Sequence, residues 1–169
     1  MNMIGAMLIM LSCTAAGIIK ARSLSELDKT YGALIAALTL MKSEITTLSA
    51  PLDAVLGRIA DSAEGDTGRF ARQVKRDFEK LGEDSFCSIW SSAAHDNLQG
   101  VSKRALSAVK ELGASLGRYD SVMQCAAIDR CVNEITLEQQ ALRTTLGANK
   151  RMYIGIGGAM GLIIAIVLI

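Results

Sequence analysis

Charge is confined to the middle of this 169-residue sequence, and both ends lack it altogether. The 18 Lys and Arg residues and the 17 Asp and Glu residues all lie between Lys20 and Arg151. The uncharged ends contain the hydrophobic segments Met3–Ile19 and Met152–Ile169. A soluble helical domain interleaves charged and apolar residues at helical spacing. This separation therefore indicates that the two ends and the middle are suited to different environments.

Each hydrophobic end is long enough to cross a lipid bilayer as a helix. A helix of the length of Met3–Ile19 or Met152–Ile169 spans roughly 26 Å, near the lower limit for the hydrocarbon core. A backbone inside lipid must satisfy its own hydrogen bonds, and a helix does so. We therefore predict transmembrane helices over residues 3–19 and 152–169. The alternative is that either segment is buried in a soluble core.

The basic residues beside these segments predict how the protein is oriented in the cell membrane. They follow the first segment and precede the second, and they are Lys20, Arg22, Lys29, Arg143, Lys150 and Arg151. Short positively charged flanks stay in the cytoplasm. The sequence thus predicts that both termini lie outside and that residues 20–151 form a cytoplasmic domain.

Residues 20–151 show helical periodicity and no alternating strand pattern. A heptad stripe runs from Leu24 to Leu48, which is the spacing of a helix packed along another helix. Ser23 or Ser25 is suited to cap its start, and the only proline, Pro51, is expected to end it. Further apolar stripes follow. The expected fold class is all-α, an up-and-down bundle of about six helices flanked by the two transmembrane helices.

The heptad stripe has two interpretations. It is either the core-facing side of one helix in a single domain or the seam of an intermolecular coiled coil, which would make the protein a homo-oligomer. Ala33, Ala36 and Ala37 widen the apolar face beyond two positions in each heptad, and this favours the core helix. The coiled coil corresponds to an alternative function, a membrane-anchored scaffold or sensor that dimerises through Leu24–Leu48.

A later apolar stripe predicts one helix that continues through Leu81. Its apolar side comprises Phe70, Val74, Phe78 and Leu81, and its reverse side carries Arg69, Arg72, Lys75, Arg76 and Lys80. This basic side is a solvated surface, a contact for anionic lipid headgroups, or a docking site for an acidic partner. Nucleic acid is a poor ligand for it, because acidic residues interleave and the net charge is only +1. The candidate partner-binding residues are Arg69, Arg72, Arg76 and Lys80.

The glycines of the second hydrophobic segment are predicted to pack helices. They do not follow a strand, and no Lys-Ser/Thr pair comes after them, so a phosphate-binding loop is excluded. Gly157, Gly161 and Ala165 are spaced by four and share one side of a helix. Small residues at this spacing let membrane helices approach closely.

No catalytic, metal or cofactor residues are predicted. The four cysteines contain no CxxC pair, and the chain has one histidine. His95 precedes Asp96, but adjacent helical residues point about 100° apart and do not face each other. We therefore expect plain reduced thiols and a protein that is not an enzyme.

Several stretches together resemble the stage III sporulation protein AB family. Leu34–Ile45 (LxxxLxxMxxEI), followed by Ala50–Leu52 (APL), resembles the family's first soluble helix and its turn. Glu111–Gln124 (ELGxxLGxxDxxxQ) resembles the signature between the later helices, and Trp90 stands where a family tryptophan is expected. Asn149–Tyr153 (NKRMY), before a glycine-containing segment, is similar to the family's ending. The resemblance covers essentially the whole chain.

Within these stretches we interpret Pro51, Leu116, Gly117 and Asp120 as a structural motif. Gly117 supplies a permissive backbone and Asp120 a cap for the last helix.

The resemblance implies an endospore-forming bacterium and an envelope complex, related to secretion systems, that links mother cell and forespore. It implies a helical domain similar to the platform protein of type II secretion and type IV pili. The implied partners are the complex's cytoplasmic secretion-type ATPase and sibling membrane subunits, in the mother-cell membrane that faces the forespore.

Overall fold

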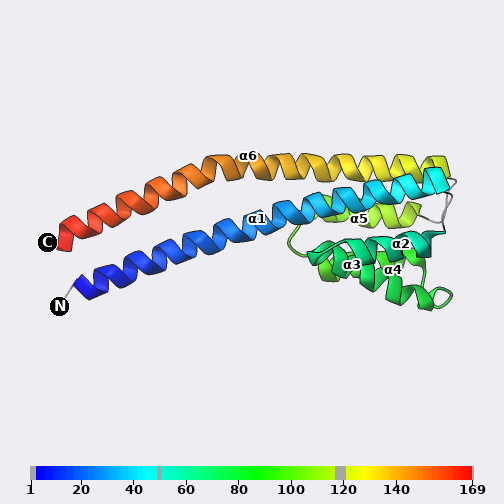
Figure 1. Cartoon of the computed structure of the whole chain (residues 1–169), viewed down its shortest axis with the longest axis horizontal. Helices are drawn as coiled ribbons and strands as arrows, with labels where there is room; N and C mark the ends of the chain where they lie inside the picture. Colours follow the sequence, from blue (N-terminus) through cyan, green and yellow to red (C-terminus); the bar gives the residue numbers. More distant parts are fainter. Residues whose placement is uncertain (1–2, 49–50, 117–120, 169) are drawn as a thin grey trace. The chain divides into compact units, whose positions relative to one another are not determined.

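The computed structural model describes residues 3–48, 51–116 and 121–168, with the side chains of residues 19, 22–47, 51–116 and 121–145. These ranges contain six α-helices, one short 3-10 helix and no β-strand (Figure 1). The α-helices are α1 (Met3–Leu48), α2 (Leu52–Ser62), α3 (Gly65–Asp77), α4 (Phe86–Asn97), α5 (Lys103–Ser115) and α6 (Ser121–Leu168). The prediction of an all-α fold is confirmed.

The chain divides into two compact units. One unit is Lys29–Gln139, and the other combines the N-terminal part of α1 with the C-terminal part of α6. In the latter unit the Arg143 guanidinium joins the two helices, because its Nε donates to the Asp28 carboxylate at 2.7 Å. This ion pair ties α1 to α6 within that unit.

The two hydrophobic segments have a helical backbone, as part of α1 and of α6. Within the portion of the chain that the structure describes, no helix combines the length and the apolar character needed to cross a membrane. The predicted spans 3–19 and 152–169 carry side chains that, except for Ile19, lie outside the described residues. Gly157, Gly161 and Ala165 fall there too. The two membrane spans and the packing role of these three small residues therefore stay predictions.

The first helix has no boundary at Ser23 or Ser25. Both residues lie inside α1, whose backbone continues from the hydrophobic segment through to Leu48. The expected cap at these serines is therefore wrong, because a residue inside a helix has no free first-turn N–H group to accept from. A single long helix replaces the two helices that the change in composition indicated.

The core of the Lys29–Gln139 unit is built on the middle of the heptad stripe. The stripe side chains that are buried there are Tyr31, Leu34, Leu38, Met41 and Ile45. They are covered within one chain, by residues from the other helices. This burial favours the interpretation of α1 as a core helix over that of an intermolecular seam.

Pro51 lies directly before the start of α2, where a proline fits well. It is the N-cap residue, with φ −63° and an extended ψ of 144°. Its carbonyl oxygen accepts hydrogen bonds from the N–H groups of Ala54 and Val55 at 3.1 and 3.2 Å. Proline has no N–H group to leave unsatisfied at this position. Pro51 thus lies where α1 has ended and α2 begins.

The helix that was expected to reach Leu81 ends earlier. The α3 helix ends at Asp77, and a 3-10 turn follows over Phe78–Lys80. Leu81 is extended and 42% exposed, and the next residue, Gly82, has a φ of +122° that favours glycine. The chain therefore reverses direction at Gly82, and Leu81 leaves the buried face that the periodicity assigned to it.

Candidate interaction surface

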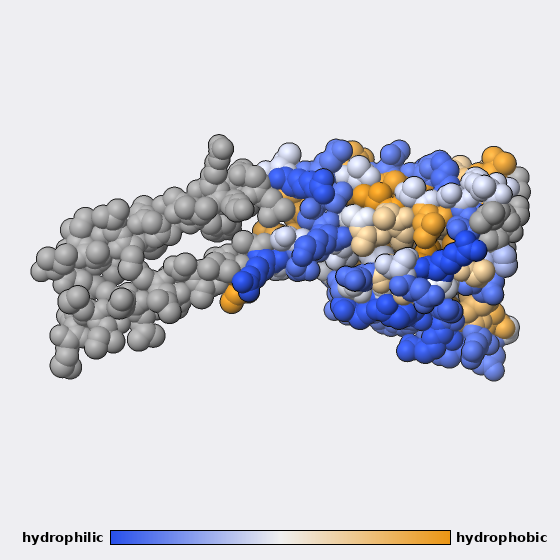
Figure 2. Space-filling view, in the orientation of Figure 1, coloured by the Kyte–Doolittle hydropathy of each residue, from blue (hydrophilic) through white to orange (hydrophobic). Residues whose placement is uncertain are grey.

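The predicted basic residues lie on the solvent-exposed side of α3 and of the 3-10 turn after it. We call Arg69, Arg72, Arg76 and Lys80 the basic face; all four are exposed. Figure 2 shows that the surface over α3 is mainly hydrophilic. The opposite side of α3 buries Phe70. The helical periodicity therefore placed these charges correctly toward solvent.

Three of the four cations already have acidic partners nearby. Arg69 is ion-paired with Asp66 within α3. The carboxylate of Asp77 lies 3.0 Å from Lys80 Nζ and 3.6 Å from Arg76 Nε. The hydrogen bond from Lys80 is the main reason that the pKa of Asp77 lies below its usual range. These local pairs reduce the charge that the basic face offers to a ligand.

Arg72 and Lys75 complete the positive charge on this side of α3. Arg72 donates to the backbone carbonyl oxygen of Ala60 on α2 at 3.2 Å, and no carboxylate of the described residues forms an ion pair with it. Lys75 is exposed and makes no ion pair within the described residues. This pair of charges has the chemistry to bind a carboxylate or phosphate group.

The motif residues are only partly described. Leu116 is buried and follows the last residue of α5, with an extended backbone at φ −67° and ψ 128°. Gly117 and Asp120 lie outside the described residues, and the cap assigned to Asp120 stays a prediction. Because its side chain is buried, Leu116 anchors the end of α5 in the apolar core.

The aromatic side chains form a row that the sequence did not reveal. Phe70 packs edge-on against Trp90, with ring centroids 4.8 Å apart. Phe86 lies 5.6 Å from Trp90, and Phe78 lies 6.1 Å from Phe86. The row contains the chain's one tryptophan and all three phenylalanines. It leads from buried Phe70 and Trp90 to half-buried Phe86 and Phe78.

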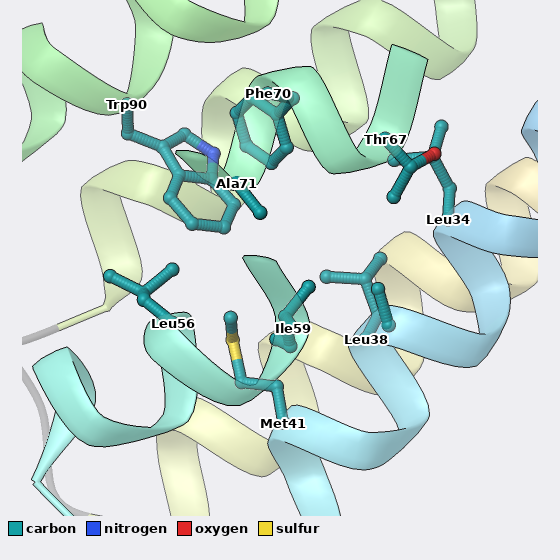
Figure 3. Close-up of a pocket in the computed structure, with 10 residues that line it drawn as sticks. Leu34, Leu38, Met41, Leu56, Ile59, Thr67, Phe70, Ala71 and Trp90 are labelled. Atoms are coloured by element: carbon teal, nitrogen blue, oxygen red, sulfur yellow. The ribbon is translucent and has the colours of Figure 1, made fainter. Parts of the chain in front are cut away.

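A small cavity lies in the core beside this row (Figure 3). Its labelled lining residues are Leu34, Leu38, Met41, Leu56, Ile59, Thr67, Phe70, Ala71 and Trp90, from α1, α2, α3 and α4. The volume is about 10 Å³, whereas ligand pockets measure roughly 300 Å³ or more. The cavity is therefore a packing defect between four helices and has no room for a small-molecule ligand.

One buried carboxylate interrupts this apolar core. Glu44 on α1 is only 8% exposed, and its Oε1 accepts a hydrogen bond from Arg58 on α2 at 2.6 Å. Its Oε2 is buried and has no hydrogen-bond partner among the residues that the structure describes. A buried acceptor without a partner costs free energy. The ion pair to Arg58 is therefore the interaction that makes burial of Glu44 tolerable.

The described cysteines are free thiols. Cys125 and Cys131 on α6 are buried, and Cys87 on α4 is half-buried. Burial raises the pKa of Cys131 to about 12, and the negative charges of Glu111 and Glu134 add to this effect. Among the described residues, no group of His, Cys, Asp and Glu side chains is arranged to hold a metal ion.

Comparison with known proteins gives one family over nearly the full length. The family model described as stage III sporulation protein AB matches residues 2–169. A solved structure titled "Stage III sporulation protein AB" aligns with a TM-score of 0.64 at 20% identity. The alignment covers 72% of this chain and 97% of the solved one, and at this identity it shows similarity of fold alone. No curated protein matches the sequence.

Proposed function

This chain belongs to the stage III sporulation protein AB family, and from that premise we propose that it is a non-enzymatic platform subunit that docks a cytoplasmic ATPase. The complex would be a secretion-like channel between mother cell and forespore. The observation that carries the proposal is the family match over residues 2–169. The helical bundle gives it a physical basis, because packed helices hold a docking surface in a fixed geometry.

Membrane attachment is part of this proposal. The uncharged segments 3–19 and 152–169 would span the bilayer, and the basic residues beside them would hold residues 20–151 in the cytoplasm. Gly157, Gly161 and Ala165 would let the second span pack closely against the first span or against a sibling subunit. Protease treatment of right-side-out vesicles should leave the central domain intact, and digestion of that domain would refute this orientation.

The basic face is one proposed contact within the complex. Its residues Arg72 and Arg76 are exposed on α3, together with Lys75, which has no ion pair within the described residues. An acidic surface on the ATPase or on a sibling subunit would supply the complementary charge. The double variant Arg72→Glu/Arg76→Glu should therefore weaken co-purification of the partner without unfolding the bundle.

The alternative function, a scaffold or sensor that dimerises through Leu24–Leu48, has less support. Its seam would use the stripe side chains between Tyr31 and Ile45, and these are buried inside a single chain. Dimerisation through them would require the bundle to open. A homo-oligomer that forms through another surface remains compatible with the proposed platform role.

Affinity purification from sporulating cells tests the proposed function directly. The full-length protein, solubilised in detergent, should bring down the secretion-type ATPase and the sibling membrane subunits of the complex. Protein from cells in vegetative growth serves as the control, because the complex is proposed to be specific for sporulation. Recovery of the protein alone from sporulating cells would contradict the platform assignment.

A further inference from the structure

The aromatic row ends at the surface of the molecule, beside an exposed leucine. Phe78 and Phe86 are half-buried, and Leu81, whose N–H group donates to the carbonyl oxygen of Phe78 at 3.1 Å, is 42% exposed. We call Phe78, Leu81 and Phe86 the aromatic tip. The buried members of the row, Phe70 and Trp90, lie in the core. Aromatic and aliphatic side chains backed by a packed core are typical of interface anchors.

The turn that carries Leu81 is held by several backbone hydrogen bonds. The carbonyl oxygen of Lys80 accepts from the N–H groups of both Glu83 and Asp84, at 3.1 Å each. The positive φ of Gly82 lets the chain close this turn. Leu81 is thus presented from an ordered backbone, so a partner that binds it has little conformational entropy to remove.

Acidic residues flank Leu81 of the aromatic tip along the chain. Glu79, Glu83 and Asp84 are exposed and make no ion pair within the described residues, and we call them the acidic rim. The one cation among them, Lys80, already pairs with Asp77 at 3.0 Å. The rim therefore keeps its negative charge, which repels acidic surfaces and attracts basic ones.

These observations define the chemistry of the partner. We propose that the aromatic tip and its acidic rim form a docking surface for a basic patch that presents an apolar side chain or pocket, on the ATPase of the complex. This inference rests on the proposed function and adds a contact whose charge is opposite to that of the basic face. The tip supplies the apolar anchor, and the rim selects the partner by charge.

Binding of purified ATPase to the detergent-solubilised full-length protein tests this surface. Glu83→Lys/Asp84→Lys should raise the Kd at least about tenfold and reduce its salt dependence. Leu81→Ser should raise the Kd by a similar factor, because it removes the anchor.

The control for the charge reversal is Asp61→Lys/Glu111→Lys, at exposed acids on α2 and α5. The control for the leucine is Leu137→Ser, which changes a 52% exposed leucine on α6. Both controls should bind as the wild type does.

The possible outcomes separate this inference from the proposed function. If the wild type binds the ATPase and the tip variants bind equally well, the docking surface is refuted while the platform role stands. If the control variants lose as much affinity as the tip variants, the effect is one of general charge or folding, and the inference is again refuted. If the wild type does not bind the ATPase, both fail. Circular dichroism melts of each variant verify that the bundle is folded.

Discussion

The indole of Trp90 lies directly against the backbone of Gly113. A β-carbon at position 113 would sit 2.3 Å from Cδ1 and 2.7 Å from Cγ of the indole, well inside contact distance. Trp90 Nε1 also donates a hydrogen bond to the carbonyl oxygen of Val109 at 2.7 Å. The two contacts set how closely α4 approaches α5. Gly113 is needed here for the space that it leaves, and its backbone is ordinary helix.

Gly113→Ala should therefore destabilise the bundle. Alanine favours a helix over glycine by about 1 kcal/mol, but forcing a methyl group into the Trp90 ring costs more, typically 1–3 kcal/mol and sometimes above that range. We expect a net loss of about 1–2 kcal/mol in the free energy of unfolding. Urea unfolding of the full-length protein in detergent, followed by Trp90 fluorescence, measures it.

Gly100→Ala is the matched control. This glycine is exposed, and a β-carbon there would meet no atom within 4 Å. Its change should stay within roughly 0.5 kcal/mol, as for most surface substitutions. Equal unfolding midpoints for the variants at positions 100 and 113 would show that the close approach of Trp90 is not a constraint on this fold.

The start of α5 should depend on Ser102. Its Oγ accepts a hydrogen bond from the N–H group of Ala105 at 3.1 Å, and its own N–H donates to the hydroxyl of Tyr31 on α1 at 3.0 Å. Ser102→Ala should cost about 1 kcal/mol through the lost cap. Tyr31→Phe should cost a similar amount, because it removes the acceptor for the Ser102 N–H group.

Thermal melts of these two variants are best compared with Ser107→Ala, which changes an exposed serine inside the same helix. That control should melt at or slightly above the wild-type temperature, since alanine favours helix. An unchanged melting temperature for Ser102→Ala would rule out the cap as a source of stability. An unchanged value for Tyr31→Phe would rule out the contribution of the hydrogen bond between α1 and α5.

Removing Arg58 should lower the free energy of unfolding, because the buried carboxylate of Glu44 then has no ion-pair partner. Arg58→Ala leaves the buried carboxylate without its 2.6 Å partner, and because Arg58 is partly exposed we expect a loss of about 1–2 kcal/mol. Glu44→Leu in the same background should recover most of this loss, because the unpaired charge is gone. Arg69→Ala, which breaks the exposed pair with Asp66, should cost less than about 1 kcal/mol. Equal losses for Arg58→Ala and Arg69→Ala in chemical unfolding would contradict this account.

Cys131 should resist alkylation in the folded protein. Its pKa is raised to about 12, so at pH 8 almost none of it is the thiolate that reacts. Peptide mapping after iodoacetamide treatment should show modification of half-buried Cys87 well before that of Cys131.

The raised pKa of Cys131 also predicts a pH dependence of stability. The thiol of the folded state stays protonated up to a higher pH than that of the unfolded state. Stability should therefore fall as the pH rises from about 9 toward 12.

Much of the fold could be predicted from periodicity. The stripe of α1 predicted the buried positions Tyr31, Leu34, Leu38 and Met41, because a helix at the edge of a core must turn its apolar side inward. Periodicity failed at Leu81, where the spacing continues but the backbone turns at Gly82. The capping preference of serine also failed at Ser23, since α1 continues from Met3 to Leu48 through the change in composition without a break.

Only part of the interaction surface could be predicted from the sequence. The exposed position of Arg72 followed from helical spacing, because residues opposite an apolar stripe face solvent. Two of the ion pairs that reduce the charge of the basic face join residues three apart, Arg69 to Asp66 and Lys80 to Asp77, which is a spacing that a helix brings together. Only the structure shows that Arg76 and Lys80 share the carboxylate of Asp77. The aromatic row joins Phe70 on α3 to Trp90 and Phe86 on α4, so it requires the two helices to be packed.

By itself, the sequence determined the helical class, the uncharged ends and the core side of α1, because these three follow from residue order and local spacing. It also determined the family of the protein, through the resemblance of its motifs to those of known members. Only the tertiary structure decided that the absence of a side chain at Gly113 leaves room for Trp90 and that Glu44 is buried against Arg58. It also decided that the aromatic row ends at the surface beside Leu81. The reason is physical: a helix fixes the direction of its side chains every 3.6 residues, but which side chains meet across two helices depends on how the helices pack.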